Sequence, residues 1–336
     1  MLKGSESPKV SIVCAWYNRA DYIKETLSSL LSQDFDSYEV IIANDGSTDP
    51  RVREILDSYN DARLRVIHKK NEGFTKTINM LMSLAKAPYV AIQGAGEIAL
   101  KNRVALQYQF LSANPDCGMV GSSSINIIKR PGQLDEVLSE NRLRQGYVGS
   151  CSSTKRLPFT HGTVMYNKHA YLSVGGYREV FKYAQDYDLF LRIAERYKCF
   201  SLSEVLYVRN VFMDGVSTSA VKSFEQAMFV NFANRCFRLR GELGIDIIDR
   251  YGVMAFAMYQ VSFQDAKLVA KTFFKLVYLA DAAEARRFIA LLGGGMFPFF
   301  LKLFIMLIEG NSVVRKAFFY LIQKKYKSSV FLKSNG

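Results

Sequence analysis

The segment YVAIQGAGEIAL, at residues 89–100, combines glycine spacing typical of nucleotide sites with a single carboxylate. Gly94, Gly96 and Ala99 fit the G-x-G-x-x-G/A pattern, in which glycine lets the backbone approach a pyrophosphate. A dinucleotide-binding fold, however, places this loop after its first strand and an acidic residue at the end of the second. Here the loop follows the fourth expected strand, so a glycine turn that only closes a strand–helix corner explains the pattern better than a dehydrogenase does.

Two further segments place small polar residues after expected strands. In NDGSTD, at residues 44–49, polar side chains could bind a base or ribose, although Ser47 and Asp49 would also cap a strand-to-helix turn. In NEGF, the backbone N–H groups near Asn71 and Gly73 would face a phosphate at a helix N-terminus, or only cap that helix. Each motif alone leaves both interpretations open.

Asp186 and Asp188 stand at the start of another expected helix, in QDYDLFLRI. Carboxylates in a first helical turn are stabilised by the helix dipole, which is sufficient reason for their presence. In the functional interpretation, one of them is a general base and the other holds the helix in place.

The elements that must position these residues alternate between short apolar runs and amphipathic stretches over the first 125 residues. The expected strands are 9–16, 38–45, 64–68, 89–94 and 117–123, and the expected helices are 19–33, 47–59, 74–86 and 100–113. This alternation predicts a parallel sheet with helices on both faces and ligands at the carboxyl ends of its strands. Residues 126–158 are expected to form an irregular polar loop, and residues after about 220 are expected to be helical.

The composition limits the function classes. The 336 residues carry a formal net charge of +13, which suits a nucleic acid, an anionic membrane or a phosphorylated substrate as partner. No module for reading bases is present, so nucleic acid is not expected. The cysteines and histidines lack the spacing of a zinc site. The N-terminal residues contain no apolar segment typical of a secretion signal, so the cytoplasm is the expected compartment.

The C-terminal part is apolar and basic. Residues 288–308 are strongly apolar, although Lys302, Pro298 and three glycines interrupt them, and no acidic residue follows Glu309. Mixed aromatic and basic residues after this segment predict a helix on the inner face of an anionic membrane; a spanning helix, a buried helical subdomain and a dimer face are the alternatives. We therefore expect a catalytic domain at 1–220 and a helical, membrane- or partner-associated region at 221–336. The sequence does not indicate an oligomeric state.

Six segments together resemble the family 2 glycosyltransferases, which have the A-type nucleotide-diphospho-sugar transferase fold. In chain order they are VSIVCAWYN, NDGSTD, NEG, YVAIQGAGE, HGTVMYNKHAYLSVGGY and QDYDLFLRI. The resemblance implies an α/β fold with a mostly parallel central sheet flanked by helices. It also implies inverting transfer of a sugar from a nucleotide-diphospho-sugar to a hydroxyl of a glycan or lipid-linked acceptor, as in the synthesis of cell-surface polysaccharide or glycolipid.

The resemblance assigns roles to individual positions. Asp186 matches the catalytic base, and Glu97 is the one acid left in the segment that binds a metal in this family. His161 and Arg209 are candidates for contacting the acceptor or the diphosphate, with a buried structural role as the alternative for His161. The expected nucleotide-sugar contacts are Ala15, Tyr17, Asn18, Asp45, Ser47, Asn71, Gly73, Gly94, Ala95 and Gly96.

The chain departs from the family pattern at residues 94–97, which read GAGE where acids such as DADD would be ordinary. Three alternatives follow. Glu97 could anchor Mg²⁺ or Mn²⁺ through the diphosphate, since magnesium sites often use few protein carboxylates. A metal-free site could instead use cationic side chains. The candidates are Lys76, Lys155, Arg156 and Arg209. Finally, the protein could bind nucleotide sugars without turnover.

Overall fold

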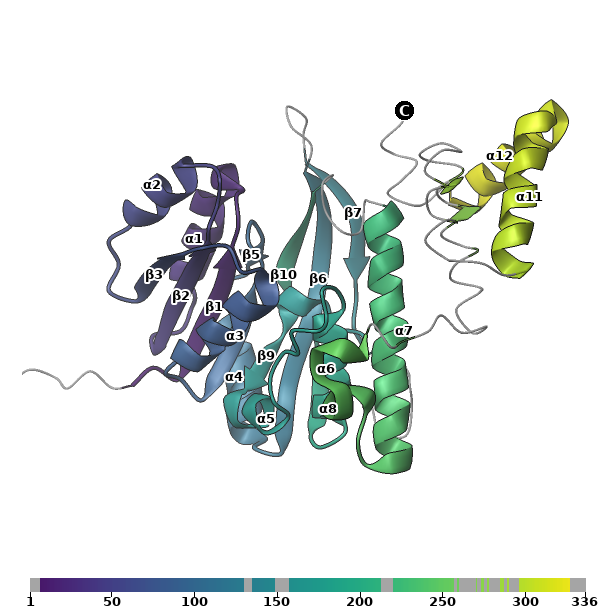
Figure 1. Cartoon of the computed structure of the whole chain (residues 1–336). Coiled ribbons are helices and arrows are strands. Elements are labelled where there is room, and N and C mark those ends of the chain that lie inside the picture. Colours follow the sequence, from purple (N-terminus) through teal and green to yellow (C-terminus); the bar gives the residue numbers. More distant parts are fainter. Residues whose placement is uncertain are drawn as a thin grey trace, which may run out of the picture.

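The computed structural model describes residues 7–129, 135–148, 157–212, 220–256 and 296–326, with isolated positions between 259 and 289. Its centre is one twisted sheet with helices on both faces (Figure 1). The strands run in the order β3-β2-β1-β4-β9-β6-β10-β5, with β7 paired to β6 and β8 to β10.

The first four strands of the sheet are parallel, as the alternation of elements predicts. They are β1 (Val10–Trp16), β2 (Tyr38–Asp45), β3 (Leu64–Lys69) and β4 (Tyr89–Gln93). The helices that connect or follow them are α1 (Ile23–Leu31), α2 (Arg51–Asp57), α3 (Phe74–Leu84) and α4 (Arg103–Ala113). Near-continuous apolar runs in the strands bury both faces of this half, which is typical of parallel sheets.

Alternate residues of β1 face two different cores. Ile12 and Cys14 pack in the core formed with α1, α2 and α4, whereas Val13 packs in the core formed with α3 and α6. Because β1 is parallel to both β2 and β4, the carboxyl ends of these three strands lie at one edge of the sheet, between two helical layers.

The second half of the sheet is mixed. It contains β5 (Ile98–Ala99), β6 (Cys117–Lys129), β7 (Glu136–Asn141), β8 (Gly146–Tyr147), β9 (Met165–Asn167) and β10 (Lys198–Phe212). β6 and β10 are parallel, but β9 lies antiparallel to both β4 and β6. The expectation of an irregular segment at 126–158 is wrong for the end of β6, for β7 and for β8. Pairing of β7 with β6 and of β8 with β10 orders polar residues that lack a strand signal of their own.

The remaining helices lie beside this half or at the C-terminal end (Figure 1). They are α5 (Lys168–Ser173), α6 (Gln185–Ala194), α7 (Ala220–Leu243), α8 (Ile247–Tyr251), α11 (Met296–Gly310) and α12 (Ser312–Tyr326). Short 3-10 helices occur at Ala20–Tyr22, His161–Thr163 and Gly252–Ala255. The helical character expected after residue 220 is confirmed for the described residues.

Helix α7 packs directly on the sheet domain. Phe229 and Phe232 of α7 share a core with Phe181 and with Tyr187 and Leu191 of α6. One face of α11 is buried against other C-terminal residues, among them Phe273. None of the helices in the part that the structure describes is long and apolar enough to cross a membrane.

Candidate active site

The turn after β1 is tied to the turn after β2 by Asn18. Its Oδ1 accepts hydrogen bonds from the backbone N–H of Thr48 at 2.9 Å and of Asp49 at 3.3 Å. Its own N–H donates to Ser47 Oγ at 2.8 Å. The structure thus brings Asn18 and Ser47, both expected at the nucleotide, into direct contact. Next to them, Tyr17 is an exposed aromatic side chain.

Asp45, at the end of β2, organises the loop that leads into α3. Its carboxylate accepts hydrogen bonds from Lys69 Nζ at 2.9 Å, Thr77 Oγ1 at 2.8 Å and the N–H groups of Glu72 and Gly73, each at 3.0 Å. Burial opposes ionisation, but these donors outweigh it and hold the pKa of Asp45 below its usual value. The N–H of Gly73 is therefore engaged by Asp45 and is not a free phosphate donor, contrary to the expectation from sequence.

Gly46 permits the close approach of the two loops. Its φ is +64°, and a Cβ added there would lie 2.4 Å from the backbone nitrogen of Asn71. Residues 44–49 and the expected nucleotide contacts Asn71 and Gly73 consequently form one continuous surface at the end of β2. Ala15 precedes this surface on β1, opposite Ala43.

Backbone conformations with positive φ also mark this edge. Within the described ranges, the non-glycine residues with positive φ are Asn18, Arg19 and Ala184. The first two follow β1, and the third immediately precedes α6. Such conformations cost energy and are often found at functional sites, because the surrounding structure must hold them in place.

The segment Gly94–Ala95–Gly96–Glu97 follows β4 and folds back on itself. A Cβ at Gly94 would lie 2.3 Å from Glu97 Oε2, so the glutamate side chain fills the space that a larger residue would need. Tyr207 on β10 donates to Glu97 Oε2 at 2.6 Å and accepts from the Gly94 N–H at 2.9 Å. Asn210 Nδ2 donates to the Gly96 carbonyl at 2.6 Å. β10 therefore fixes this segment.

Arginines surround the only carboxylate of that segment. Burial raises the pKa of Glu97, while the hydrogen bond from Tyr207 and the positive charges of Arg209, Arg19 and Arg103 oppose the rise. Arg103 is itself buried beneath the Tyr207 ring, 4.8 Å from its centroid, and burial lowers its pKa to about 10. Burial thus has the larger effect on the pKa of Glu97, and the guanidinium groups offset part of it.

These residues do not fit a divalent ion. Gly94, Ala95 and Gly96 provide no side-chain oxygen, and the carboxylate of Glu97 already accepts from Tyr207. Neighbouring guanidinium groups would repel a cation placed beside that carboxylate. No group of at least three His, Cys, Asp or Glu side chains that could hold a metal occurs in the described part of the chain.

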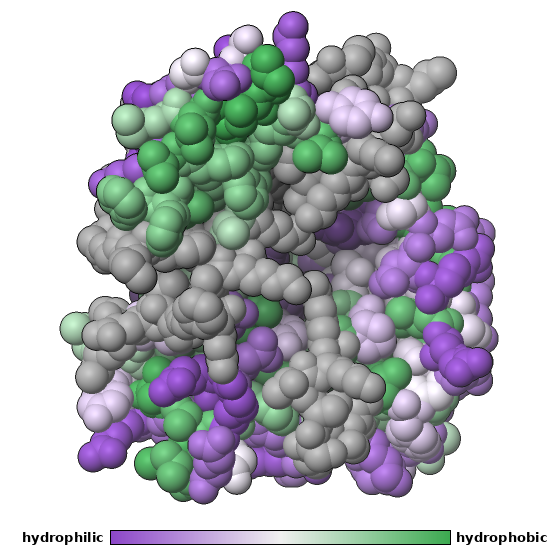
Figure 2. Space-filling view, turned by 90° about the vertical axis from the view of Figure 1, so that its right-hand side faces the viewer, coloured by the Kyte–Doolittle hydropathy of each residue, from purple (hydrophilic) through white to green (hydrophobic). Residues whose placement is uncertain are grey.

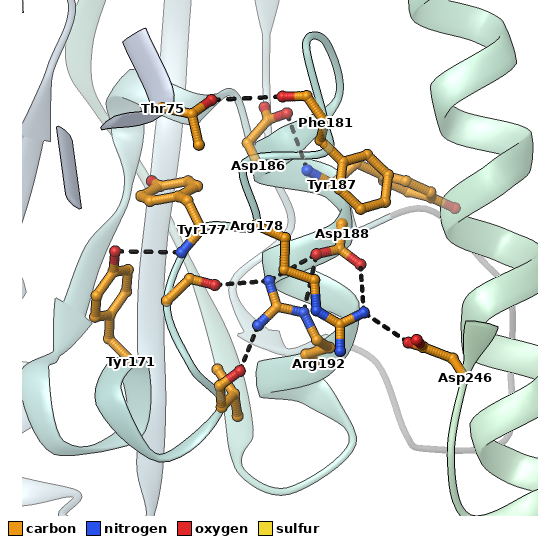
Figure 3. Close-up of polar contacts among 12 residues, drawn as sticks. Thr75, Tyr171, Tyr177, Arg178, Phe181, Asp186, Tyr187, Asp188, Arg192 and Asp246 are labelled. Atoms are coloured by element: carbon orange, nitrogen blue, oxygen red, sulfur yellow. Dashed lines mark hydrogen bonds and ion pairs between the residues drawn. The ribbon is translucent and has the colours of Figure 1, made fainter. Parts of the chain in front are cut away.

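Asp186 and Asp188 lie at the start of α6 in different surroundings (Figure 3). Asp186 is partly exposed and its Oδ1 accepts a hydrogen bond from the N–H of Tyr187 at 2.9 Å. Asp188 is fully buried and accepts from Arg192 Nε at 2.9 Å and Nη2 at 2.6 Å. Asp188 is therefore the acid that holds the helix, and Asp186 is the one available for chemistry.

The buried pair belongs to a larger ionic network. Arg178 lies 3.9 Å from Asp188 and donates to Asp246 at 2.6 Å, just before α8. Arg240 of α7 also pairs with Asp246 and with Glu195, which follows α6. This network fixes α7 and α8 against the helix that carries Asp186.

His161, expected either to contact the acceptor or the diphosphate or to be structural, lies in the short 3-10 helix before β9. Its Nε2 is 2.6 Å from Tyr177 Oη, and Tyr177 Oη is 3.1 Å from Tyr166 Oη. Burial lowers the pKa of His161, whereas the charge of Asp186 opposes this. His161 and Asp186 thus interact electrostatically.

Several important residues were missed from sequence, among them Tyr207, Arg103 and Arg178. For the buried pair a signal was available, because Asp188 and Arg192 have the i,i+4 spacing of helical ion pairs. Of the cationic candidates, Arg209 lies near Glu97, while Lys76 is an exposed residue 3.9 Å from Glu179. Lys155 and Arg156 lie outside the described residues.

Residues 11–173 match the protein family described as Glycosyl transferase family 2. Among curated proteins, the chain is 28% identical over 209 residues to the “Putative glycosyltransferase EpsE” of Bacillus subtilis, covering 60% of this chain and 73% of that protein. It is also 28% identical over 227 residues to the chondroitin synthase of Pasteurella multocida, covering 66% of this chain but only 23% of the synthase.

Two solved structures share the fold. One is S. aureus TarS 1–349 in complex with UDP, with a TM-score of 0.52 and 16% identity over 95% of this chain and 91% of that one. The other is the mannosyltransferase PcManGT from Pyrobaculum calidifontis in complex with GDP-Man and Mn²⁺, with a TM-score of 0.52 and 17% identity over 96% and 88%. At these identities the similarity shows the fold alone.

Proposed function

Because residues 11–173 form a glycosyl transferase family 2 domain, the protein is a glycosyltransferase, and we propose that it is an inverting one. Its donor in this proposal is a nucleotide-diphospho-sugar, and its acceptor is a hydroxyl of a glycan or a lipid-linked sugar. The ligands named in the two similar structures, UDP in one and GDP-Man in the other, support a nucleotide-sugar donor in this proposal. Cell-surface polysaccharide or glycolipid synthesis is the proposed setting.

The observation that carries the proposal is the contrast between the two acids of α6. Asp188 is fully buried and paired with the guanidinium of Arg192, so its carboxylate is engaged in a structural contact. Asp186 lies two residues earlier and is partly exposed, and among the described residues its carboxylate accepts a hydrogen bond only from the adjacent N–H of Tyr187. A general base must be reachable by the acceptor hydroxyl, a condition that the partial exposure of Asp186 meets and the full burial of Asp188 does not.

In the proposed reaction Asp186 removes the proton of the acceptor hydroxyl as its oxygen attacks the anomeric carbon. The diphosphate leaves from the opposite face, which inverts the configuration. In this proposal His161 contacts the acceptor or the diphosphate, and the buried Tyr177 holds the His161 ring through its hydroxyl. Tyr17, Asn18 and Ser47 bind the nucleoside, and Asp45 acts through the loop at residues 72–73 that it holds.

Turnover tests this proposal. Purified protein is assayed with a panel of UDP-, GDP- and dTDP-sugars and with oligosaccharide and lipid-linked acceptors. For the donor that responds, Asp186→Asn is expected to reduce kcat by about 10²–10⁴-fold. Glu179→Gln is the matched control, because it removes an exposed carboxylate from the neighbouring loop. Nucleotide binding without turnover across the panel would favour the alternative, a nucleotide-sugar-binding protein that has lost catalysis.

The surface of α11 and α12 supports membrane attachment in this proposal. Figure 2 shows a hydrophobic area that includes these helices. Its exposed apolar side chains are Phe299, Phe300, Leu303, Met306, Leu307, Val313, Val314, Tyr320 and Leu321. Lys302, Arg315 and Lys316 are exposed on the same helices. Apolar and cationic groups together suit an anionic lipid surface, which we propose to be the inner, cytoplasmic leaflet.

Vesicle sedimentation separates this docking from other uses of the surface. Vesicles containing phosphatidylglycerol are expected to bind the protein, and vesicles of phosphatidylcholine alone are expected to bind it more weakly. The double variant Arg315→Glu and Lys316→Glu should lose most of the difference. Equal binding of wild type and variant would contradict electrostatic docking, and concentration-dependent dimers without vesicle binding would identify the surface as a dimer face.

A further inference from the structure

The end of β10 places cationic and aromatic groups against residues 94–97. Arg209 is half-buried on β10, directly before Asn210, whose side chain donates to the Gly96 carbonyl. Its positive charge acts on Glu97. Its guanidinium forms no hydrogen bond or ion pair within the described residues. Arg19 stacks on the ring of Phe212, 3.5 Å from its centroid, and a Cβ at Gly96 would lie 3.0 Å from that ring. Among the described residues, Arg209 is thus a partly buried cation that interacts with Glu97 through its charge but has no hydrogen-bonded partner.

This cluster joins two parts of the proposed donor site. Arg19 belongs to the turn after β1, next to Asn18, and Glu97 follows β4, the parallel neighbour of β1. In an open α/β sheet, ligands bind at the carboxyl ends of such neighbouring strands. A donor bound at the turns after β1 and β2 would have its diphosphate within reach of this cluster.

We propose that Arg209, supported by Arg19, binds the donor diphosphate and offsets its charge without a divalent cation. This inference rests on the proposed function and deepens it. During transfer the bond between the anomeric carbon and the diphosphate oxygen breaks, and its electron pair remains on the nucleoside diphosphate. The acceptor oxygen bonds to the anomeric carbon, and its proton passes to Asp186. A guanidinium matches phosphate geometry and keeps its charge throughout.

The residues around Glu97 explain why this carboxylate does not take the place of a metal ligand. It fills the space above Gly94 and accepts from Tyr207, and its charge partly compensates the surrounding arginines. In this arrangement Glu97 keeps the arginines in place, and the net positive charge that remains favours an anion.

Calorimetry with UDP and GDP tests the inference on the full-length protein. Each nucleotide is titrated in excess EDTA and, separately, with saturating Mn²⁺. The nucleotide that binds is expected to have the same affinity in both buffers. Arg209→Gln should weaken its binding by about tenfold or more, and Arg209→Lys should weaken it less. Arg65→Gln is the matched control, because Arg65 is an exposed arginine on β3 and its loss should leave binding unchanged.

The outcomes separate this inference from the proposed function. If binding and turnover require Mn²⁺, or if Arg209→Gln binds like wild type, the metal-free assignment is wrong while the glycosyltransferase proposal stands. If neither nucleotide binds in either buffer and no donor is turned over, both fail. EDTA-resistant turnover together with the loss in Arg209→Gln supports both.

Discussion

Replacing Asp188 by Asn should destabilise the protein far more than replacing Asp186 by Asn. Asp188 is fully buried and Arg192 is only 3% exposed, so the substitution leaves a buried guanidinium without its counter-charge. Breaking a buried ion pair in this way costs about 3–5 kcal/mol. Because Arg192 keeps its hydrogen bonds to the carbonyls of Val174 and Gly176, we expect a loss of unfolding free energy at the lower end of this range, about 3 kcal/mol.

Asp186 offers the control for this prediction on the same helix turn. It is partly exposed, and the amide oxygen of Asn can still accept from the N–H of Tyr187. Its loss should therefore cost no more than about 0.5 kcal/mol of unfolding free energy. The two substitutions make the same chemical change at positions two residues apart. Their difference in unfolding free energy therefore reports the different surroundings of the two carboxylates.

Urea unfolding provides the assay. Trp16 is the single tryptophan and is fully buried on β1, so its fluorescence reports the sheet core. A double-mutant cycle of Asp188→Asn with Arg192→Gln should give a coupling energy of about 1–3 kcal/mol. A loss below about 1 kcal/mol for Asp188→Asn, or an equal loss for Asp186→Asn, would refute the division of roles between the two acids.

Three further predictions concern the surrounding site. Asp45→Asn should lower stability at neutral pH. Because the folded-state pKa of Asp45 is lowered, its contribution to the free energy of unfolding is present above the unfolded-state pKa of about 3.9 and is lost as the pH falls through the lower folded-state pKa. The stabilities of wild type and variant should therefore converge in acid. Gly46→Ala should cost more than about 1 kcal/mol and weaken nucleotide binding, because the new Cβ would collide with Asn71; unchanged thermal unfolding and affinity would show that the loops adjust freely. Tyr207→Phe removes the donor to Glu97 and should destabilise by about 1.5–3 kcal/mol in chemical unfolding, whereas a neutral effect would mean that Glu97 is held by the arginines alone.

The sequence predicts the first half of the fold well because its strands are continuous apolar runs separated by amphipathic helices. The antiparallel direction of β9 is not predictable in the same way. This strand has only three residues, and they carry no signal for the direction in which it pairs with its neighbours β4 and β6. β7 is similarly set by its partner β6 and not by its own polar residues.

In the candidate site, too, some features are predictable from local sequence and others depend on distant residues. Motif order is sufficient to place Asn18, Ser47 and Asp186 at loops and helix starts, where the structure finds them. The orientation of Glu97 depends on Tyr207, a residue 110 positions away, so residues 94–97 alone do not determine whether that acid faces a ligand. The engagement of the Gly73 N–H by Asp45 likewise becomes visible only when β2 and α3 are assembled.

In the proposed mechanism Asp186 accepts the proton of the attacking hydroxyl. Single-turnover transfer from the responding donor can be measured for wild type and for folded Asp186→Asn at saturating donor and acceptor. Transfer by the variant is expected to be slower by at least about a hundredfold while its donor affinity is retained. Transfer at the wild-type rate by the folded variant would show that Asp186 is not the general base.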